Sequence, residues 1–186
     1  ELIGGLEGDR FEEARGWVDD LQLGGSSRPD MAFLHAVVPH NPWEYLPDGT
    51  RYEMEEPATG QLFGPFWSGS GVDVGYQRHV LQTQAADVLL GEMLDKLEAT
   101  GLYDDALVVV TADHGAAFVP DEPSRALSVG NAAEIAWIPL LVKEPGQDAA
   151  VQDETNLEQV DVVPLIADVL GVEVTWDIDG VVPEDA

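Results

Sequence analysis

Two short segments of the sequence carry side chains suited to catalysis or metal binding. The first is the motif Asp-His-Gly at 113–115, which follows a β-branched apolar run, and the second is the segment Pro-His-Asn-Pro at 39–42. A carboxylate beside an imidazole offers one hard oxygen and one borderline nitrogen, which suit Mn, Mg, Zn or Ca according to the remaining ligands. The sequence therefore nominates Asp113 and His114 as metal ligands, and His40, between two prolines, as a residue with a functional role.

Each of the four histidines also has a plainer explanation. Asp and Gly are ordinary turn residues at the end of a strand, so on the pattern alone a capped turn explains the segment around His114 better than a metal site does. His40 is explained by a surface turn between two prolines. His35 lies inside an apolar run, which favours a core histidine, and His79 follows an arginine on a long helical pattern, which favours a packing or surface role.

The N-terminal half of the sequence alternates helical and extended patterns that would position these residues. Residues 9–23 repeat apolar side chains at helical spacing, which predicts an amphipathic helix. The apolar run at 31–38 predicts a strand buried on both faces, whose end leads to His40. The longest helical pattern runs from Tyr76 to Ala99, with Gly101 as its C-cap.

The C-terminal half adds two strand patterns and a helix. Residues 107–110 predict a central parallel strand that ends at the Asp-His-Gly motif. Residues 136–144 predict a further strand, in which Pro139 indicates the start of the strand or an edge position. Asp161 is expected to cap a short helix that ends at Gly171. Together these patterns predict one α/β domain over 1–186, a layered and mostly parallel sheet flanked by helices, with an N-terminal helix and linker at 1–25 and a long loop at 41–73.

The composition excludes several classes of function. Lys and Arg number 8 against 36 Asp and Glu, a formal net charge of -28, so nucleic acid is excluded as a partner. The acidic residues are spread along the chain, which suits a soluble, salt-tolerant surface. Cysteine is absent, which excludes disulfides and thiolate metal sites. No apolar stretch approaches the roughly 18 residues of a membrane span, and we expect this chain to be soluble.

Four segments resemble the second half of bacterial sulfatase-like hydrolase/transferase domains, in the alkaline phosphatase/sulfatase superfamily. They lie at 33–52, 76–118, 138–147 and 160–172, in the order and spacing of that family. The resemblance implies the α/β fold of alkaline phosphatase and a metal-dependent reaction on sulfate or phosphate esters, carried by a small molecule, a glycan or a lipid. It also implies an extracytoplasmic, cell-surface domain anchored by preceding membrane helices.

The resemblance assigns roles to individual residues. Asp113 and His114 match the aspartate and its neighbour that coordinate the divalent metal, which would be Mn, Ca, Mg or Zn. His40 matches the histidine of a Pro-His-x-Pro segment that contacts the transferring group or the leaving oxygen. Arg125 lies where the family often keeps basic side chains and is a substrate-binding candidate, although a solvated surface arginine explains it equally well.

The sequence also departs from the family pattern. No equivalent of the first metal-binding aspartates or of the Ser, Thr or formylglycine nucleophile occurs before residue 30. Two protein ligands are fewer than a catalytic metal normally requires, so we expect the isolated chain to be inactive and to bind metal weakly or not at all. Two alternatives stay open: a non-catalytic extracellular binding or sensing domain with a degenerate sulfatase-like fold, and a lone α/β domain whose Asp-His-Gly motif is a turn.

Overall fold

The structure, a computed structural model, describes residues 2–3, 8–25, 29–53 and 70–182. The chain divides into two compact units, which are described separately. Unit 1 comprises Glu1–Gly101 and His114–Trp137, and unit 2 comprises Leu102–Asp113 and Ile138–Ala186. The single domain expected from the length stays a prediction. No helix among the described residues is both long enough and apolar enough to cross a membrane.

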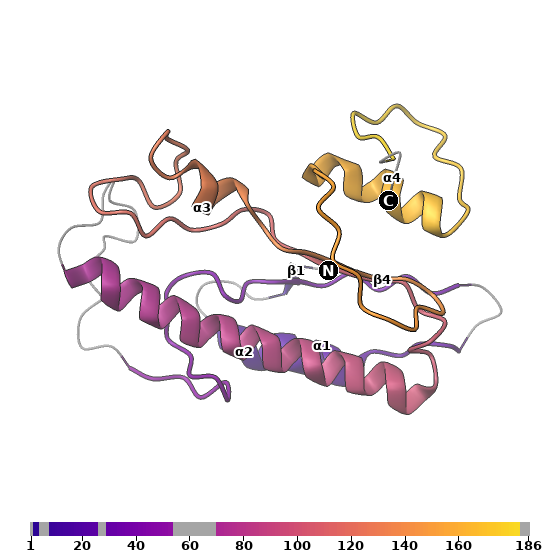
Figure 1. The fold of residues 1–186 in the computed structure, drawn as a ribbon. Coiled ribbons are helices and arrows are strands. Elements are labelled where there is room, and N and C mark those ends of the chain that lie inside the picture. Colours follow the sequence, from indigo (N-terminus) through magenta and orange to yellow (C-terminus); the bar gives the residue numbers. More distant parts are fainter. Residues whose placement is uncertain (1, 4–7, 26–28, 54–69, 183–186) are drawn as a thin grey trace. The chain divides into compact units, whose positions relative to one another are not determined.

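The first helix, α1 (Arg10–Asp20), begins where the sequence predicts and ends before the expected Leu23. Asp9 caps it, because the side chain of Asp9 accepts the backbone N–H of Glu12 at 3.1 Å and so satisfies a free donor of the first turn. Figure 1 shows α1 lying along the C-terminal half of α2. The core of unit 1 lies between them and contains the buried residues Phe11, Ala14, Val18, Tyr45, Ala85 and Leu89.

The long helix α2 (Ser70–Thr100) begins earlier than the predicted Tyr76. The segment Ser-Gly-Val-Asp-Val-Gly has low helix propensity, but Val72 is buried and Asp73 places a negative charge in the first turn, where the helix dipole favours it. The buried stripe of α2 includes Ala85, Leu89 and Leu97. Gly101 ends the helix at φ +73°, as predicted.

The apolar run at 31–38 forms much less strand than expected. Within it, β2 (His35–Ala36) is the part paired as a strand, in parallel with β1 (Leu2–Ile3). Met31 and Phe33 are exposed, and so is the side chain of His35. The predictions of a strand buried on both faces and of a core histidine are therefore wrong.

The long loop expected at 41–73 is described at 41–53, and residues 54–69 lie outside the described part. Residues 70–73 belong to α2, so the expected end of the loop is wrong. Its first portion makes a tight turn in which Tyr45 and Arg51 form an isolated bridge. At the turn, Gly49 adopts φ +82°, which favours glycine. The turn packs so closely on α1 that a Cβ at Gly49 would lie 2.1 Å from Cε1 of Phe11.

Unit 2 contains a two-stranded sheet of β3 (Val108–Thr111) and β4 (Leu140–Lys143). The strands are antiparallel, with Val108 opposite Lys143 and Thr111 opposite Leu140, so the expected parallel pairing is wrong for this pair. The chain leaves β3 and enters β4 at the same end of the sheet, which forces the second strand to run back along the first. β4 begins directly after Pro139, in agreement with this proline as the start of the strand, but it has 4 residues and is shorter than the strand expected at 136–144.

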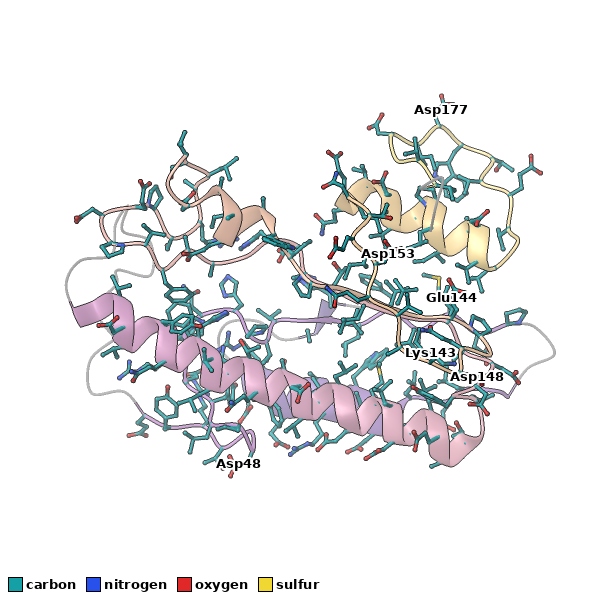
Figure 2. The ribbon with its side chains drawn as sticks, viewed as in Figure 1. Asp48, Lys143, Glu144, Asp148, Asp153 and Asp177 are labelled. Atoms are coloured by element: carbon teal, nitrogen blue, oxygen red, sulfur yellow. The ribbon has the colours of Figure 1, made fainter. Side chains whose placement is uncertain are left out.

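A lysine and an aspartate hold the loops of unit 2. Nζ of Lys143, labelled in Figure 2, donates to the carbonyls of Tyr103, Asp104 and Ala106. The side chain of Asp161 accepts the N–H of Val181 at 2.9 Å and of Glu158 at 2.8 Å, which lowers its pKa. Asp161 occupies the expected N-cap position of α4 (Val162–Val169) but makes no capping hydrogen bond to it. Its side chain instead completes the capping box of a short 3-10 helix (Gln159–Asp161), whose N-cap is Glu158.

A substitution at Gly49 should test the contact between this turn and the core. We expect Gly49→Ala to lower the free energy of unfolding by about 2 kcal/mol or more, because the new methyl group would overlap the ring of Phe11 at an unfavourable φ. Gly91→Ala on α2 is the matched control: it meets no atom within 4 Å and should stabilise the helix by roughly 0.5–1 kcal/mol. Urea denaturation measures both, and equal effects would contradict the packing described.

Candidate functional site

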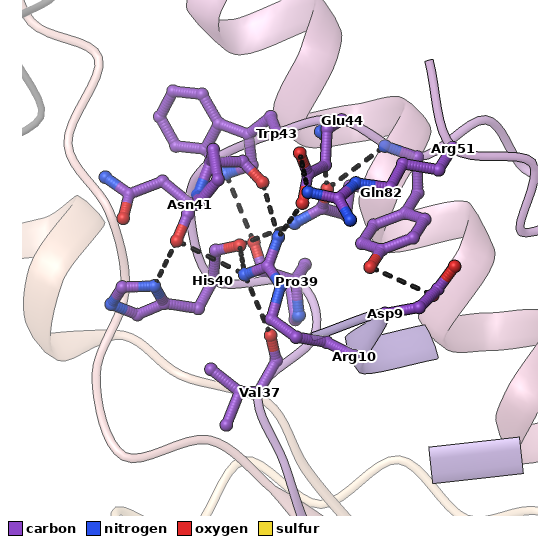
Figure 3. Close-up of polar contacts among 12 residues, drawn as sticks. Asp9, Arg10, Val37, Pro39, His40, Asn41, Trp43, Glu44, Arg51 and Gln82 are labelled. Carbon is purple, nitrogen blue, oxygen red and sulfur yellow. Dashed lines mark hydrogen bonds and ion pairs between the residues drawn. The ribbon is translucent and has the colours of Figure 1, made fainter. Parts of the chain in front are cut away.

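His40 lies in a tight loop whose hydrogen bonds fix its imidazole (Figure 3). Nδ1 of His40 lies 2.5 Å from the carbonyl oxygen of Asn41. Because a carbonyl oxygen only accepts hydrogen bonds, Nδ1 carries the proton and Nε2 carries the lone pair of the neutral ring. The structure therefore makes Nε2 the nitrogen available for chemistry.

The loop around His40 is held by a single buried arginine from α1. Arg10 is completely buried, and its guanidinium donates to the carbonyls of Val37, His40 and Asn41 through Nη1 and of Pro42 through Nη2, at 3.2, 2.8, 3.2 and 2.6 Å. A planar fork of N–H donors can reach four carbonyls that face one centre. The segment 37–42 is consequently wrapped around one side chain.

Three further side chains, labelled in Figure 3, complete this network. Nη2 of Arg10 lies 3.3 Å from Oε1 of Glu44, whose other carboxylate oxygen lies 3.1 Å from Arg51. Gln82 of α2 is also completely buried: its Nε2 donates to the carbonyl of His40 at 2.6 Å, and its Oε1 accepts the N–H of Glu44 at 2.9 Å. Glu44 balances the buried charge, as a buried guanidinium requires.

His114 has the same internal arrangement as His40. Nδ1 of His114 lies 2.7 Å from the carbonyl oxygen of Gly115, so Nδ1 again carries the proton. Nε2 lies 2.6 Å from a guanidinium nitrogen of Arg125, which can only donate. Both contacts select the same tautomer, with the lone pair on Nε2. The structure thus brings together two of the residues nominated from the sequence, His114 and Arg125.

The backbone around this pair explains why a glycine follows His114. Gly115 donates its N–H to the carbonyl of Ile135 at 2.8 Å, and a Cβ at Gly115 would lie 1.9 Å from the carbonyl oxygen of Glu134. The close approach of α3 (Ala132–Ala136) leaves no room for a side chain at Gly115. The sequence motif therefore reflects packing at the glycine.

Asn131 shapes the loop that carries Arg125. Its buried amide donates to the carbonyls of Pro123 and Ala126 at 2.7 and 2.9 Å and accepts the N–H of Ser128 at 2.7 Å. These bonds tie both sides of Arg125 to one side chain. Arg125 itself is exposed, so its head group is accessible to a ligand as well as to His114.

The metal ligands predicted from the sequence fit a metal site in part. An imidazole whose Nδ1–H is held by a backbone carbonyl and whose lone pair is on Nε2 is the usual form of a metal-binding histidine, and His114 has this form. Asp113 is exposed and belongs to unit 2, whereas His114 belongs to unit 1. Among the described residues, no group of three or more His, Asp or Glu side chains is placed to hold a metal ion.

His79 has the packing role that the sequence favoured. Its ring lies against Trp43 and Phe118, with centroids 5.6 and 5.2 Å apart. It borders a pocket of about 570 Å³, also lined by Val72, Asp73, Tyr76, Ala116, Phe118 and Glu134. Burial lowers the pKa of His79, since the charged form loses hydration there.

The sequence reasoning missed Arg10 and Gln82, although a signal for each was present. Arg10 is four residues before Ala14 and eight before Val18, so it lies on the buried face of α1. Gln82 is likewise in helical register with the buried Ala85 and Leu89 of α2. A polar side chain on the apolar stripe of a helix needs a buried partner, and that requirement points to the loop it binds.

Comparisons with known proteins agree on one family. The family model described as Sulfatase matches residues 7–172. Over 129 residues the chain is 33% identical to PehA of Trinickia caryophylli, a multifunctional alkaline phosphatase superfamily protein, covering 65% of the chain and 25% of that relative. It is 33% identical over 95 residues to arylsulfatase K of Xenopus laevis, covering 51% of the chain and 17% of that relative. The chain therefore spans about a quarter or less of these curated relatives.

A solved structure supports the fold. The crystal structure of a protein ascribed to the sulfatases, from Bacteroides thetaiotaomicron, matches 91% of the chain with a TM-score of 0.54, at 17% identity. The match covers 38% of that structure. At this identity the likeness concerns the fold alone, and it shows a partial sulfatase-like fold.

The lowered pKa of His79 predicts how stability depends on pH. The unfolded chain takes up this proton near pH 6.5, whereas the folded chain takes it up only at lower pH, so acidification below about pH 6.5 favours unfolding. His79→Phe should reduce the fall in Tm between pH 7.5 and 5.5, because the aromatic packing is kept and the titrating group is lost. The exposed His35→Gln is the control and should leave that fall unchanged. An undiminished fall in the His79 variant would contradict the assignment.

Proposed function

The chain belongs to the sulfatase family of the alkaline phosphatase superfamily, and on that basis we propose that it forms part of a metal-dependent enzyme acting on sulfate or phosphate esters. The observation that carries the proposal is that two histidines are held in the same tautomer by the same kind of hydrogen bond. His40 and His114 each hold Nδ1–H on the carbonyl of the next residue and direct the chemistry to Nε2. A histidine that merely fills a turn has no need of one defined tautomer.

We assign His40 the role of proton donor to the leaving oxygen. In its protonated form, the imidazole keeps Nδ1–H on Asn41 and can give the Nε2 proton to the oxygen that departs from sulfur or phosphorus. The neutral ring left behind is already in the tautomer that the loop stabilises. Proton transfer therefore requires no rotation of the ring.

Asp113 and His114 are proposed as metal ligands because they are adjacent in the sequence and offer a carboxylate oxygen and an imidazole nitrogen, within the segment that the Sulfatase family model covers. A divalent metal bound there would supply a positive charge next to the ester oxygens. Two ligands do not complete a catalytic site. We place the remaining ligands and the nucleophile outside residues 1–186, since the chain spans only a quarter of its relative PehA. The isolated chain is accordingly proposed to be inactive.

Arg125 is proposed to bind an anionic oxygen of the substrate. Its exposed guanidinium is a planar donor suited to sulfate or phosphate oxygens, and its present contact, Nε2 of His114, is a neutral acceptor that an anion can outcompete. The chain carries a net charge of -28, which repels anions at long range. A local cation at the site offsets that repulsion for the bound ester.

The substrate is proposed to be a sulfate ester in the first place, because the family match and arylsulfatase K both point to sulfate chemistry. PehA is named for the alkaline phosphatase superfamily, so phosphate esters are the second class to test. The ester would be carried by a small molecule, a glycan or a lipid, outside the cytoplasm. Transfer to another alcohol instead of water uses the same leaving-group step.

Activity assays on the complete protein that contains this chain test the proposal. We expect hydrolysis of an aryl sulfate or an aryl phosphate that a chelator abolishes, and a kcat at least about 100-fold lower in His40→Gln, because the leaving oxygen loses its proton donor. Asp113→Asn should raise the metal concentration needed for activity. His35→Gln is the matched control and should leave kcat unchanged, since that side chain is exposed on β2.

Two outcomes would contradict the proposal. If the complete protein turned over none of these esters with Mn, Mg, Ca or Zn, the alternative of a non-catalytic binding or sensing domain would replace it. If the protein were active and His40→Gln were as active as the wild type, the role assigned to His40 would be wrong. Titration calorimetry on the 186-residue chain adds a further check, because a submicromolar metal site abolished by Asp113→Ala would refute the incomplete ligand set.

A further inference from the structure

We infer that Arg10 and Gln82 are positioning residues that aim the imidazole of His40, by holding the two carbonyls next to it in the chain. The catalytic purpose of this positioning rests on the role proposed for His40, whereas the positioning itself does not. The hold itself follows from contacts of the described residues. Figure 3 shows that the donors converge on this loop from two helices, Arg10 from α1 and Gln82 from α2.

The carbonyl oxygen of Asn41 connects Arg10 directly to the imidazole. This oxygen accepts Nη1 of Arg10 at 3.2 Å and Nδ1 of His40 at 2.5 Å. The peptide that orients the imidazole is therefore itself oriented by the guanidinium. If Arg10 were removed, this carbonyl would be free to rotate and the ring would lose the acceptor that selects its tautomer.

The carbonyl oxygen of His40 is held from both sides. It accepts Nη1 of Arg10 at 2.8 Å and Nε2 of Gln82 at 2.6 Å. Two donors on different helices fix a peptide plane more firmly than one, because a rotation that keeps one bond breaks the other. The backbone of His40, and with it the direction of Cβ, is consequently tied to both helices.

Burial makes this hold rigid. Arg10 and Gln82 are both fully buried, so neither side chain can exchange its bonds for bonds to water. Gln82 also binds the loop beyond His40, since its Oε1 accepts the N–H groups of Glu44 and Tyr45 at 2.9 and 3.3 Å. The conformation of the loop is thus fixed before any substrate binds. A proton donor that must point in one direction requires such a fixed loop.

Two substitutions separate aiming from general support of the fold. Gln82→Glu keeps an oxygen to accept the N–H groups of Glu44 and Tyr45, but it loses the N–H that holds the carbonyl of His40. Arg10→Lys keeps a positive charge near Glu44, but an ammonium group cannot span the four carbonyls. Arg15→Lys is the matched control on the same helix, because Arg15 pairs with Glu12 and Glu92 and not with the loop.

The direct readout is the tautomer of His40 in the chain labelled with ¹⁵N-histidine, whose four histidines give separate signals in long-range ¹H–¹⁵N spectra. We expect a single Nδ1–H tautomer at His40 in the wild type and in Arg15→Lys, and a mixture of tautomers in Gln82→Glu and Arg10→Lys. The signals of His79, packed between Trp43 and Phe118, report whether each variant is folded. If Arg10→Lys does not fold, Gln82→Glu decides.

Two results would overturn the inference. One is an Nε2–H tautomer of His40 in the wild type, which needs no variant to fold. The other is a wild-type His40 pattern in folded Gln82→Glu. In the complete protein, Gln82→Glu should lower kcat on the order of 10- to 100-fold with little change in KM, since the proton donor is misdirected and substrate contacts are kept. A mixture of His40 tautomers in the variants, together with full activity of His40→Gln in the complete protein, would refute the proposed function. It would leave the positioning role of Arg10 and Gln82 intact.

Discussion

The guanidinium of Arg10 is the group on which the arrangement of unit 1 depends. Removing a charge from water costs several kcal/mol, and the cost is offset only when the N–H groups find acceptors of good geometry. Arg10 finds them in four carbonyls of one short segment and in the carboxylate of Glu44. The helix α1 and the loop of His40 therefore form a single hydrogen-bonded body.

The two histidines of the candidate site share a local device. Each imidazole bonds to the carbonyl of the residue that follows it in the sequence, so the tautomer is set within two residues of chain. What differs is the surrounding support: Arg10 of α1 donates to the carbonyl of Asn41 beside His40, whereas the N–H of Gly115 beside His114 donates to the carbonyl of Ile135 in α3. One chemical requirement, a lone pair on Nε2, is met by two different kinds of packing.

Much of the helical structure was predictable because helices depend on near neighbours in the sequence. The apolar spacing identified α1 and α2, and Gly101 marked the end of the longer helix correctly. Strand pairing depends on residues far apart, and there the sequence misled. The run ending at Thr111 is a strand, but nothing local to it encodes the antiparallel partner Leu140–Lys143. The contact of Arg125 with His114, eleven residues apart, was equally beyond local patterns.

Most of the few lysine and arginine side chains of the chain are engaged in contacts within the two units. The positive side chains with described bonds hold carbonyls, carboxylates or an imidazole inside the units: Arg10, Arg15, Arg51, Lys96, Arg125 and Lys143. These side chains bind other groups of the chain, and 8 Lys and Arg are too few to give each of the 36 Asp and Glu a basic partner of its own. The negative charge of the surface is therefore screened mainly by cations from the solvent. In a protein with similar numbers of acidic and basic residues, surface lysine and arginine side chains would do this.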